Sequence, residues 1–272
     1  MAQIKAHQEL GWGYLELRAV DGKLVTRMNN REFDPIYAAV TAAGLKVSCF
    51  SSGIANWAHP ITGKLRPDTD ELRRAIAHMR LCGTRYIRIM SYPNDEKHPV
   101  PEAEWRREAI RRVKRMVRIA EEYNVVLAHE NCSGWGGISW ENNLALIEAI
   151  DSPNFGVLFD TGNPPTYGKD TWEWYLKVRD RIIYVHIKDA RLNLSHDPEQ
   201  DVYTYAGEGD GCVRRVLADL VRRNWTGFVS TEPHLAAVIH TGQKAEPQAL
   251  YDSYVEYGRK LMDLIKQIRA EA

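Results

Sequence analysis

The chain has 272 residues, and its 36 lysines and arginines are balanced by 36 aspartates and glutamates, so its formal net charge is zero. This balance argues against nucleic-acid binding through counterion release and against attachment to a membrane through a polybasic surface. No run approaches the roughly 18 apolar residues of a membrane span. Because no cysteine lies in a CxxC pair and the start has no apolar signal region, we expect a reduced, cytoplasmic protein.

Short β-branched or aromatic runs alternate with helical patterns along the chain, which is typical of βα units. The first segment, Gln3–Leu10, reads as the end of a helix. The strands predicted after it are Gly13–Arg18, Lys46–Ser51, Arg85–Ser91, Val125–Asn131, Phe155–Asp160, Ile182–Lys188 and Gly227–Glu232. The predicted helices are Asp34–Ala43, Asp70–Leu81, Glu102–Glu122, Ser139–Ile150, Thr171–Lys177, Cys212–Arg223 and a last one from about Gln248 to Arg269.

Several of these boundaries carry turn or capping residues. Gly44 and Gly83 stand where a helix needs a left-handed residue to end. The run 67–70, Pro-Asp-Thr-Asp, offers capping residues before the next helix. The polar stretch 189–211 is long for a compact domain and ends in a glycine-rich run, so we expect it to be functional or disordered.

Seven strands that alternate with helices predict an α/β fold, a (β/α)8 TIM barrel in one domain over residues 1–272, with the first strand missing or replaced. A doubly wound sheet is disfavoured because no glycine-rich phosphate turn follows the first predicted strand. An open barrel leaves two unpaired edges. We therefore expect the N-terminal segment, a second copy or a partner chain to cover the opening, or the natural chain to begin further upstream.

Four predicted strands end in residues of metal-ligand type, namely Glu130, Asp160, His186 and Glu232. The carboxyl ends of barrel strands converge on one face, where the active site lies. One such residue alone is more often a cap or a surface charge, but four together favour a site. Three carboxylates and one imidazole suit Mn²⁺, Mg²⁺ or Co²⁺ better than a structural Zn²⁺. His129 points away from Glu130 in a regular strand, which favours a structural role.

The strings HENCSGWGG, LFDTGNP, VHIKDAR, GEGDG and STEPH resemble the xylose-isomerase-like TIM barrel superfamily. Within it they are most similar to the sugar (phosphate) isomerase/epimerase branch, which includes the ketose 3-epimerases. The stretch LELRAVDGK…GLKVSCF also resembles that branch, so the likeness covers nearly the whole chain. In that family the second of eight strands corresponds to Gly13–Arg18, which agrees with a missing first strand.

The resemblance implies a divalent metal, most simply Mn²⁺ with Mg²⁺ or Co²⁺ as alternatives, held by Glu130, Asp160, His186 and Glu232. It implies that Glu130 and Glu232 also act as acid and base. The implied reaction moves a proton next to a carbonyl through a metal-stabilised enediolate, in a small sugar or sugar derivative. Which sugar is used, and whether it is phosphorylated, stays open.

Five further residues are candidate substrate contacts. Lys188 and Arg191 could face substrate oxygens, or form a salt bridge and a surface charge instead. Trp135 could form an apolar wall for a sugar ring, although packing is the commoner role of a tryptophan. Glu208 lies in the glycine-rich run, which could close over the site or form a simple turn, and His234 follows Glu232 closely.

Other functions remain open at this point. The same metal and base could drive β-elimination, as in the dehydratase and C-glycoside-cleaving relatives of this fold. The family often has a histidine three residues after the aspartate, but this chain has Asn163, which puts a second metal in doubt. An abasic-site endonuclease is disfavoured by the same substitution and by the neutral charge. A non-catalytic sugar-binding subunit is disfavoured because no ligand is lost.

Overall fold

The computed structural model describes residues 2–195, 197–238 and 243–272. Internal contacts divide the chain into two compact units, each made of segments that are far apart in the sequence. The first unit comprises residues 1–12, 159–180 and 184–272, and the second comprises residues 13–158 and 181–183. The predicted single domain stays a prediction. Among the helices of the described ranges, none is long and apolar enough to cross a membrane.

Seven strands follow one another in the order β1-β4-β5-β6-β7-β8-β11. Parallel pairing joins β1 to β4, β4 to β5, β5 to β6, β6 to β7 and β8 to β11. The α/β TIM barrel fold and all seven predicted strands are therefore confirmed, and within the described residues no strand precedes β1 in this sheet. The strands are β1 (Tyr14–Leu17), β4 (Lys46–Ser51), β5 (Tyr86–Ser91), β6 (Val126–Gly134), β7 (Phe155–Asp160), β8 (Ile182–Ile187) and β11 (Phe228–Thr231).

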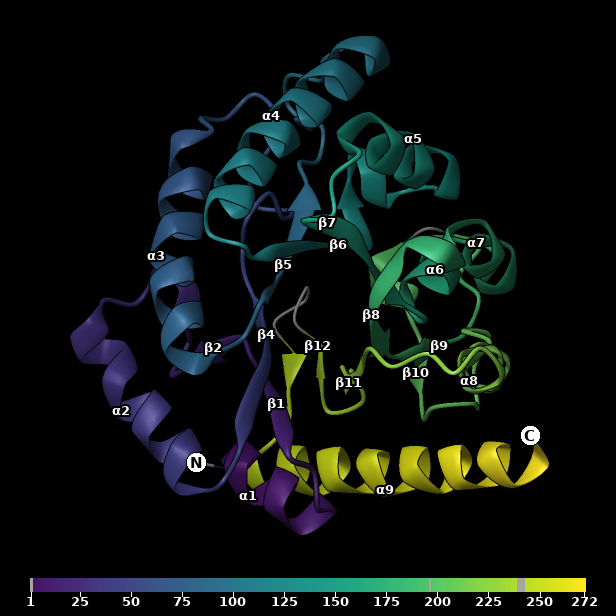
Figure 1. The fold of residues 1–272 in the computed structure, drawn as a ribbon. Helices are drawn as coiled ribbons and strands as arrows, with labels where there is room; N and C mark the ends of the chain where they lie inside the picture. Colours follow the sequence, from purple (N-terminus) through teal and green to yellow (C-terminus); the bar gives the residue numbers. More distant parts are fainter. Residues whose placement is uncertain (1, 196, 239–242) are drawn as a thin grey trace. The chain divides into compact units, whose positions relative to one another are not determined.

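The second unit alternates its strands with long helices. α3 packs against β4, and α4 packs against β5 and β6, so that both helices cover the same side of these strands (Figure 1). This arrangement buries the apolar stripe of each helix, including Leu72 and Met79 of α3 and Val113 and Met116 of α4. The helices of this unit are α2 (Asn30–Ala42), α3 (Arg66–Cys82), α4 (Glu102–Glu122) and α5 (Trp140–Ile150).

The two helix ends predicted at glycine are confirmed, but the predicted starts of two helices are wrong. Gly44 and Gly83 both have a left-handed φ, at 73° and 69°. α2 begins four residues before Asp34, because Asn29 caps it in a reciprocal pair with Glu32. α3 begins at Arg66, because a proline in the first turn loses no helical hydrogen bond. The run 67–70 thus lies inside α3 and does not precede it.

The first unit holds the N-terminal and C-terminal helices together. α1 lies along the first part of α9 (Figure 1), and Ala6, Leu10 and Val255 form a small apolar core between them. The predicted helical start of the chain is therefore confirmed. Besides α1 (Ala2–Leu10) and α9 (Pro247–Glu271), the unit contains α6 (Asn163–Thr166), α7 (Thr171–Val178) and α8 (Val213–Arg222).

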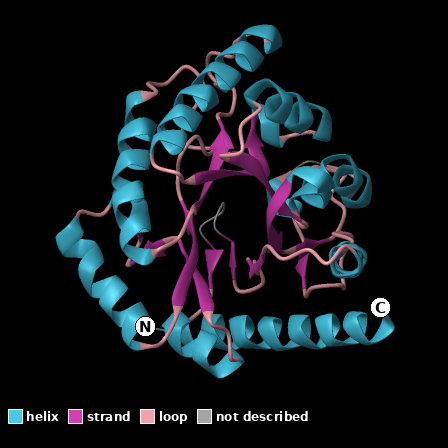
Figure 2. Ribbon diagram, viewed as in Figure 1, coloured by secondary structure: helices cyan, strands magenta, loops and turns pink. Residues whose placement is uncertain are grey.

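The loops contain short strands and 3-10 helices; the strands are magenta in Figure 2. The long loop after β8 is ordered where β9 (Asp189–Ala190) pairs with β10 (Tyr203–Thr204) in antiparallel fashion. Two other antiparallel pairs are β2 (Ala19–Val20) with β3 (Lys23–Leu24), and β12 (Ala237–Val238) with β13 (Gln243–Lys244). The 3-10 helices are Val25–Arg27, Trp135–Gly137, Arg179–Arg181 and Pro198–Gln200.

Candidate metal centre

Three of the predicted metal ligands gather in the first unit. Asp160 ends β7, His186 lies near the end of β8, and Glu232 follows β11. Parallel pairing sets Ser230 of β11 opposite His186 of β8, so the carboxyl ends of these two strands lie side by side. Each of the three side chains offers one ligand atom, and these atoms lie within 4.8 Å of one another. Two carboxylates and one imidazole at this spacing fit a divalent cation.

Glu232 faces an imidazole with each of its oxygens. Oε2 lies 3.1 Å from Nδ1 of His186, and Oε1 lies 3.7 Å from Nε2 of His234. Burial alone would raise the pKa of the Glu232 carboxyl, but the two imidazoles and the charge of Lys188 outweigh it and hold the pKa well below its ordinary value. The carboxylate is thus ionised near neutral pH, which is the form that binds a metal.

Asp160 is held rigidly in the interior. Its Oδ1 accepts hydrogen bonds from the backbone N–H groups of Gly162 and Asn163, at 2.8 and 3.0 Å. Its Oδ2 lies 3.2 Å from Nζ of Lys188, which also donates to Oδ1 of Asn163 at 2.6 Å. The backbone at Gly162 passes so close to Lys188 that a Cβ there would lie 2.7 Å from the Lys188 Cγ, so this position requires glycine. Lys188 therefore balances one ligand charge inside the fold.

The fourth predicted ligand, Glu130, lies in β6 of the second unit. It is 2% exposed, and its Oε2 lies 3.2 Å from Nη1 of Arg88, a β5 residue that is also 2% exposed. Nη2 of Arg88 donates to the carbonyl of Ser52 at 3.1 Å. Arg88 is not among the site residues predicted from the sequence, although a cation between Ile87 and Ile89 in a predicted strand is a signal of a buried, paired charge.

Two neighbours of Glu130 have structural contacts. His129 is fully buried, and its Nδ1 lies 3.1 Å from Nδ2 of Asn143. Burial lowers the pKa of His129 to about 4, so this imidazole is neutral at pH 7. Trp135 is 1% exposed, and its indole N–H donates to Glu102 of α4 at 2.7 Å. Its predicted role as a wall for a sugar ring stays a prediction.

The remaining predicted contacts lie in the loop after β8. Arg191 is exposed, and its backbone N–H donates to the carbonyl of Val202 at 2.8 Å. Glu208 is also exposed and lies 3.4 Å from Nζ of Lys260 on α9. The structure therefore brings Lys188 and His234 to the ligand carboxylates and turns Glu208 toward α9. Substrate contact by any of them stays a prediction.

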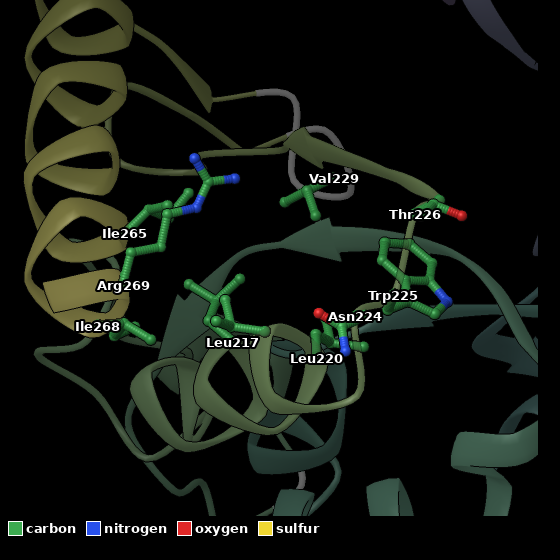
Figure 3. A pocket seen from close by; sticks show the side chains of 11 residues that line it. Leu217, Leu220, Asn224, Trp225, Thr226, Val229, Ile265, Ile268 and Arg269 are labelled. Atoms are coloured by element: carbon green, nitrogen blue, oxygen red, sulfur yellow. The ribbon is translucent and has the colours of Figure 1, made fainter. Parts of the chain in front are cut away.

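A separate cavity of about 430 Å³ lies between α8 and α9 in the first unit (Figure 3). Leu217 and Leu220 of α8, Val229 of β11 and Ile265 of α9 line it. None of the predicted site residues contributes to this lining. The cavity is therefore distinct from the group of carboxylates and imidazoles described above.

Curated relatives resemble parts of the chain in amino-acid sequence. Inosose dehydratase from Bacillus velezensis is 28% identical over 131 residues, which are 44% of this chain and 44% of that protein. The chain spans about half the length of the curated relatives it matches, 40–52% for the first three.

Solved structures share the fold over nearly the full length. A D-tagatose 3-epimerase-like protein gives a TM-score of 0.75 at 18% identity, over 96% of this chain and 91% of that one. The IOLI protein with a binding zinc atom gives 0.72 at 14% identity, over 97% and 92%. The model of the xylose isomerase-like TIM barrel family matches residues 4–261, and the chain belongs to that family.

Proposed function

We propose that the protein is a divalent-metal-dependent isomerase or epimerase of a small sugar or sugar derivative, which moves a proton next to a carbonyl. The observation that carries this proposal is the group of Asp160, His186 and Glu232, whose ligand atoms lie within 4.8 Å of one another; the first two side chains are buried and Glu232 is half-buried. We further propose that Glu130 of the second unit supplies the fourth ligand. Structural relatives that include a D-tagatose 3-epimerase-like protein support the reaction class.

The chain's own residues can supply the proton transfer. Glu232 is ionised, so it can accept a proton from the carbon next to the substrate carbonyl, and Glu130, in its protonated carboxylic acid form, would return one. Lys188 can donate a hydrogen bond to a substrate oxygen that becomes more negative during the reaction. When bound, a divalent cation would supply Lewis acidity at the carbonyl oxygen and a neighbouring hydroxyl.

The identity of the metal follows from the donor set in our proposal. Oxygen donors with a single imidazole favour Mn²⁺, and Mg²⁺ or Co²⁺ would satisfy the same donors. The zinc atom of the IOLI protein makes Zn²⁺ the necessary competitor in any metal test. Metal content after growth in medium with all four ions, followed by activity with each ion, distinguishes these alternatives.

Hydrogen–deuterium exchange in D₂O tests the reaction directly. We would incubate ketoses, 3-keto-glycosides and their phosphates with the protein, with and without Mn²⁺, and follow each substrate by mass spectrometry and NMR. We expect metal-dependent deuterium at a carbon next to the carbonyl, and we expect Glu232→Gln to abolish it. Glu256→Gln, an exposed carboxylate change on α9, is the matched control.

No exchange across the panel, with metal shown to be bound, would reject enolising chemistry on these substrates. Exchange that is equal without metal would reject the proposed role of the metal, and exchange that survives in Glu232→Gln would reject Glu232 as the base.

A second candidate is a lyase that uses the same group to eliminate water. The relatives named inosose dehydratase favour it, because they resemble this chain in amino-acid sequence, at 28% and 26% identity over 131 and 155 residues. Elimination would begin with the same proton removal and end with loss of a hydroxyl from the next carbon. A product lighter than substrate by one water, with the ultraviolet absorbance of a conjugated ketone, would select the lyase over the epimerase.

A further inference from the structure

We propose that Tyr203, held in place by the loop that Asp189 anchors, is a positioning residue that fixes His234 and thereby orients Glu232. This inference rests on the proposed function, because Glu232 matters as a metal ligand and base. Every residue involved lies in the first unit.

Asp189 organises the glycine-rich run. Its carboxylate is buried, and it accepts hydrogen bonds from the backbone N–H groups of Gly207, Gly209 and Gly211 at 2.8, 3.0 and 2.8 Å. A fourth comes from Ala190 at 3.0 Å. A loop that directs this many amides at one carboxylate is shaped around that charge.

The glycines are required by the close approach of the loop to Asp189. A Cβ at position 211 would lie 2.7 Å from Oδ1 of Asp189, and one at position 209 would overlap the same atom. Gly207 has a φ of 90°, in the left-handed region. The sequence run GEGDG is therefore explained by the anchor on Asp189, while Glu208 between the glycines faces α9.

The anchored loop places Tyr203 against His234. Tyr203 lies on β10, opposite Ala190 of β9, and its hydroxyl donates to Asp201 at 3.3 Å. The ring centroids of Tyr203 and His234 are 4.8 Å apart with an interplanar angle of 69°, an edge-to-face contact. His234 is 3% exposed, so this contact restricts a ring that has little other freedom.

His234, once fixed, limits the positions that the Glu232 carboxylate can take. Its Nε2 lies 3.7 Å from Oε1 of Glu232, while His186 contacts the other oxygen. Residues that orient a ligand in this way typically change metal affinity by about 10–100-fold when they are removed. The contacts therefore run from Asp189 through the loop to Tyr203, and from Tyr203 through His234 to the carboxylate.

Co²⁺ binding to the full chain tests the inference, with the visible absorption of the ion as a report on its coordination. We expect Tyr203→Leu to weaken Co²⁺ binding by about tenfold and to alter the spectrum. Tyr203→Phe, which keeps the ring and loses only the hydroxyl, should restore most of the affinity. Tyr203→Leu combined with His234→Ala should bind no more weakly than His234→Ala alone, because both changes act through one contact.

A readout without metal keeps the inference separate from the proposed function. The ¹⁵N shifts of the His234 ring in the metal-free protein report its tautomer, and we expect Tyr203→Leu to change them while Tyr203→Phe does not. If the wild type fails to bind Co²⁺, the proposed function fails, and the NMR result still decides the ring contact. Unchanged His234 shifts in Tyr203→Leu, or fully additive losses in the double variant, would overturn the inference.

Discussion

Two buried ion pairs, one in each unit, join their charges over the same distance, and their cations stand at different places along a strand. Lys188 follows the end of β8, whereas Arg88 lies within β5. Lys188 and Asp160 in the first unit, and Arg88 and Glu130 in the second, each join their charges at 3.2 Å with at most 3% of any side chain exposed. Asp160 also accepts two backbone N–H groups. These two backbone N–H groups still hold the Asp160 carboxylate when its cation is removed, so loss of Lys188 should cost less than removal of one partner from a buried ion pair usually does.

The largest effect should follow removal of the carboxylates themselves. Glu232→Gln and Glu130→Gln keep the volume of each side chain but remove its charge and its basicity. We expect turnover to fall by about 10²–10⁴-fold in each variant, since a positioned acid or base contributes that much. Circular dichroism and urea unfolding check that the fold is kept, and near-normal turnover in either variant would reject its assigned role.

Arg88→Met should cost the most stability, because it leaves Glu130 buried without its compensating cation. The expected loss is about 3–5 kcal/mol of the free energy of unfolding. Urea denaturation measures it. Arg88→Met combined with Glu130→Gln removes both charges and should recover part of the loss, and a double variant as unstable as Arg88→Met would contradict the pairing.

Lys188→Met is the matching change in the first unit. We expect a smaller loss, about 2–3 kcal/mol, because the backbone N–H groups of Gly162 and Asn163 still satisfy Asp160. A loss as large as about 3–5 kcal/mol in Lys188→Met would show that the backbone support of Asp160 contributes nothing measurable.

The smallest effect concerns His129, which adjoins Glu130 in the sequence. Its pKa is about 4 in the folded chain, below the value near 6.5 of a free imidazole, so the unfolded chain binds the proton first as the pH falls. Stability is therefore full above pH ~6.5 and declines toward pH ~4, by about 2 kcal/mol between pH ~7 and ~5. Urea unfolding at several pH values measures this decline.

His129→Gln is the control for that titration, because its amide can still bond to Asn143. The pH dependence of unfolding should be shallower in this variant. Parallel stability curves for His129→Gln and the wild type would show that burial does not shift the pKa of His129.

The strands could be predicted because the pattern of apolar residues and the turn residues that bound each strand are local properties of the sequence. Lys46–Ser51 and Phe155–Asp160 have the predicted bounds, since each run contains β-branched and aromatic residues, which favour a strand. The start of α3 could not, because Asp68 resembles a cap in the sequence but is buried in contact with Ala55 and His59. Such a contact depends on chain segments that the local pattern does not contain.

The candidate site shows the same division. Asp160, His186 and Glu232 stand at strand ends, where topology alone brings them together. Arg88 lies in mid-strand, and only the pairing of β5 with β6 reveals its partner Glu130. Tyr203 and Asp189 gain their roles from a loop whose shape depends on hydrogen bonds to backbone groups, which residue types do not specify.

Titration with Mn²⁺ tests the central claim most directly. Electron paramagnetic resonance reports the free ion, so its signal falls as Mn²⁺ binds. We predict one tight site per chain in the wild type and a loss of at least about tenfold in affinity in His186→Ala, which removes the only imidazole of the proposed ligand set. Equal affinity in His186→Ala and the wild type would contradict a metal centre built on Asp160, His186 and Glu232.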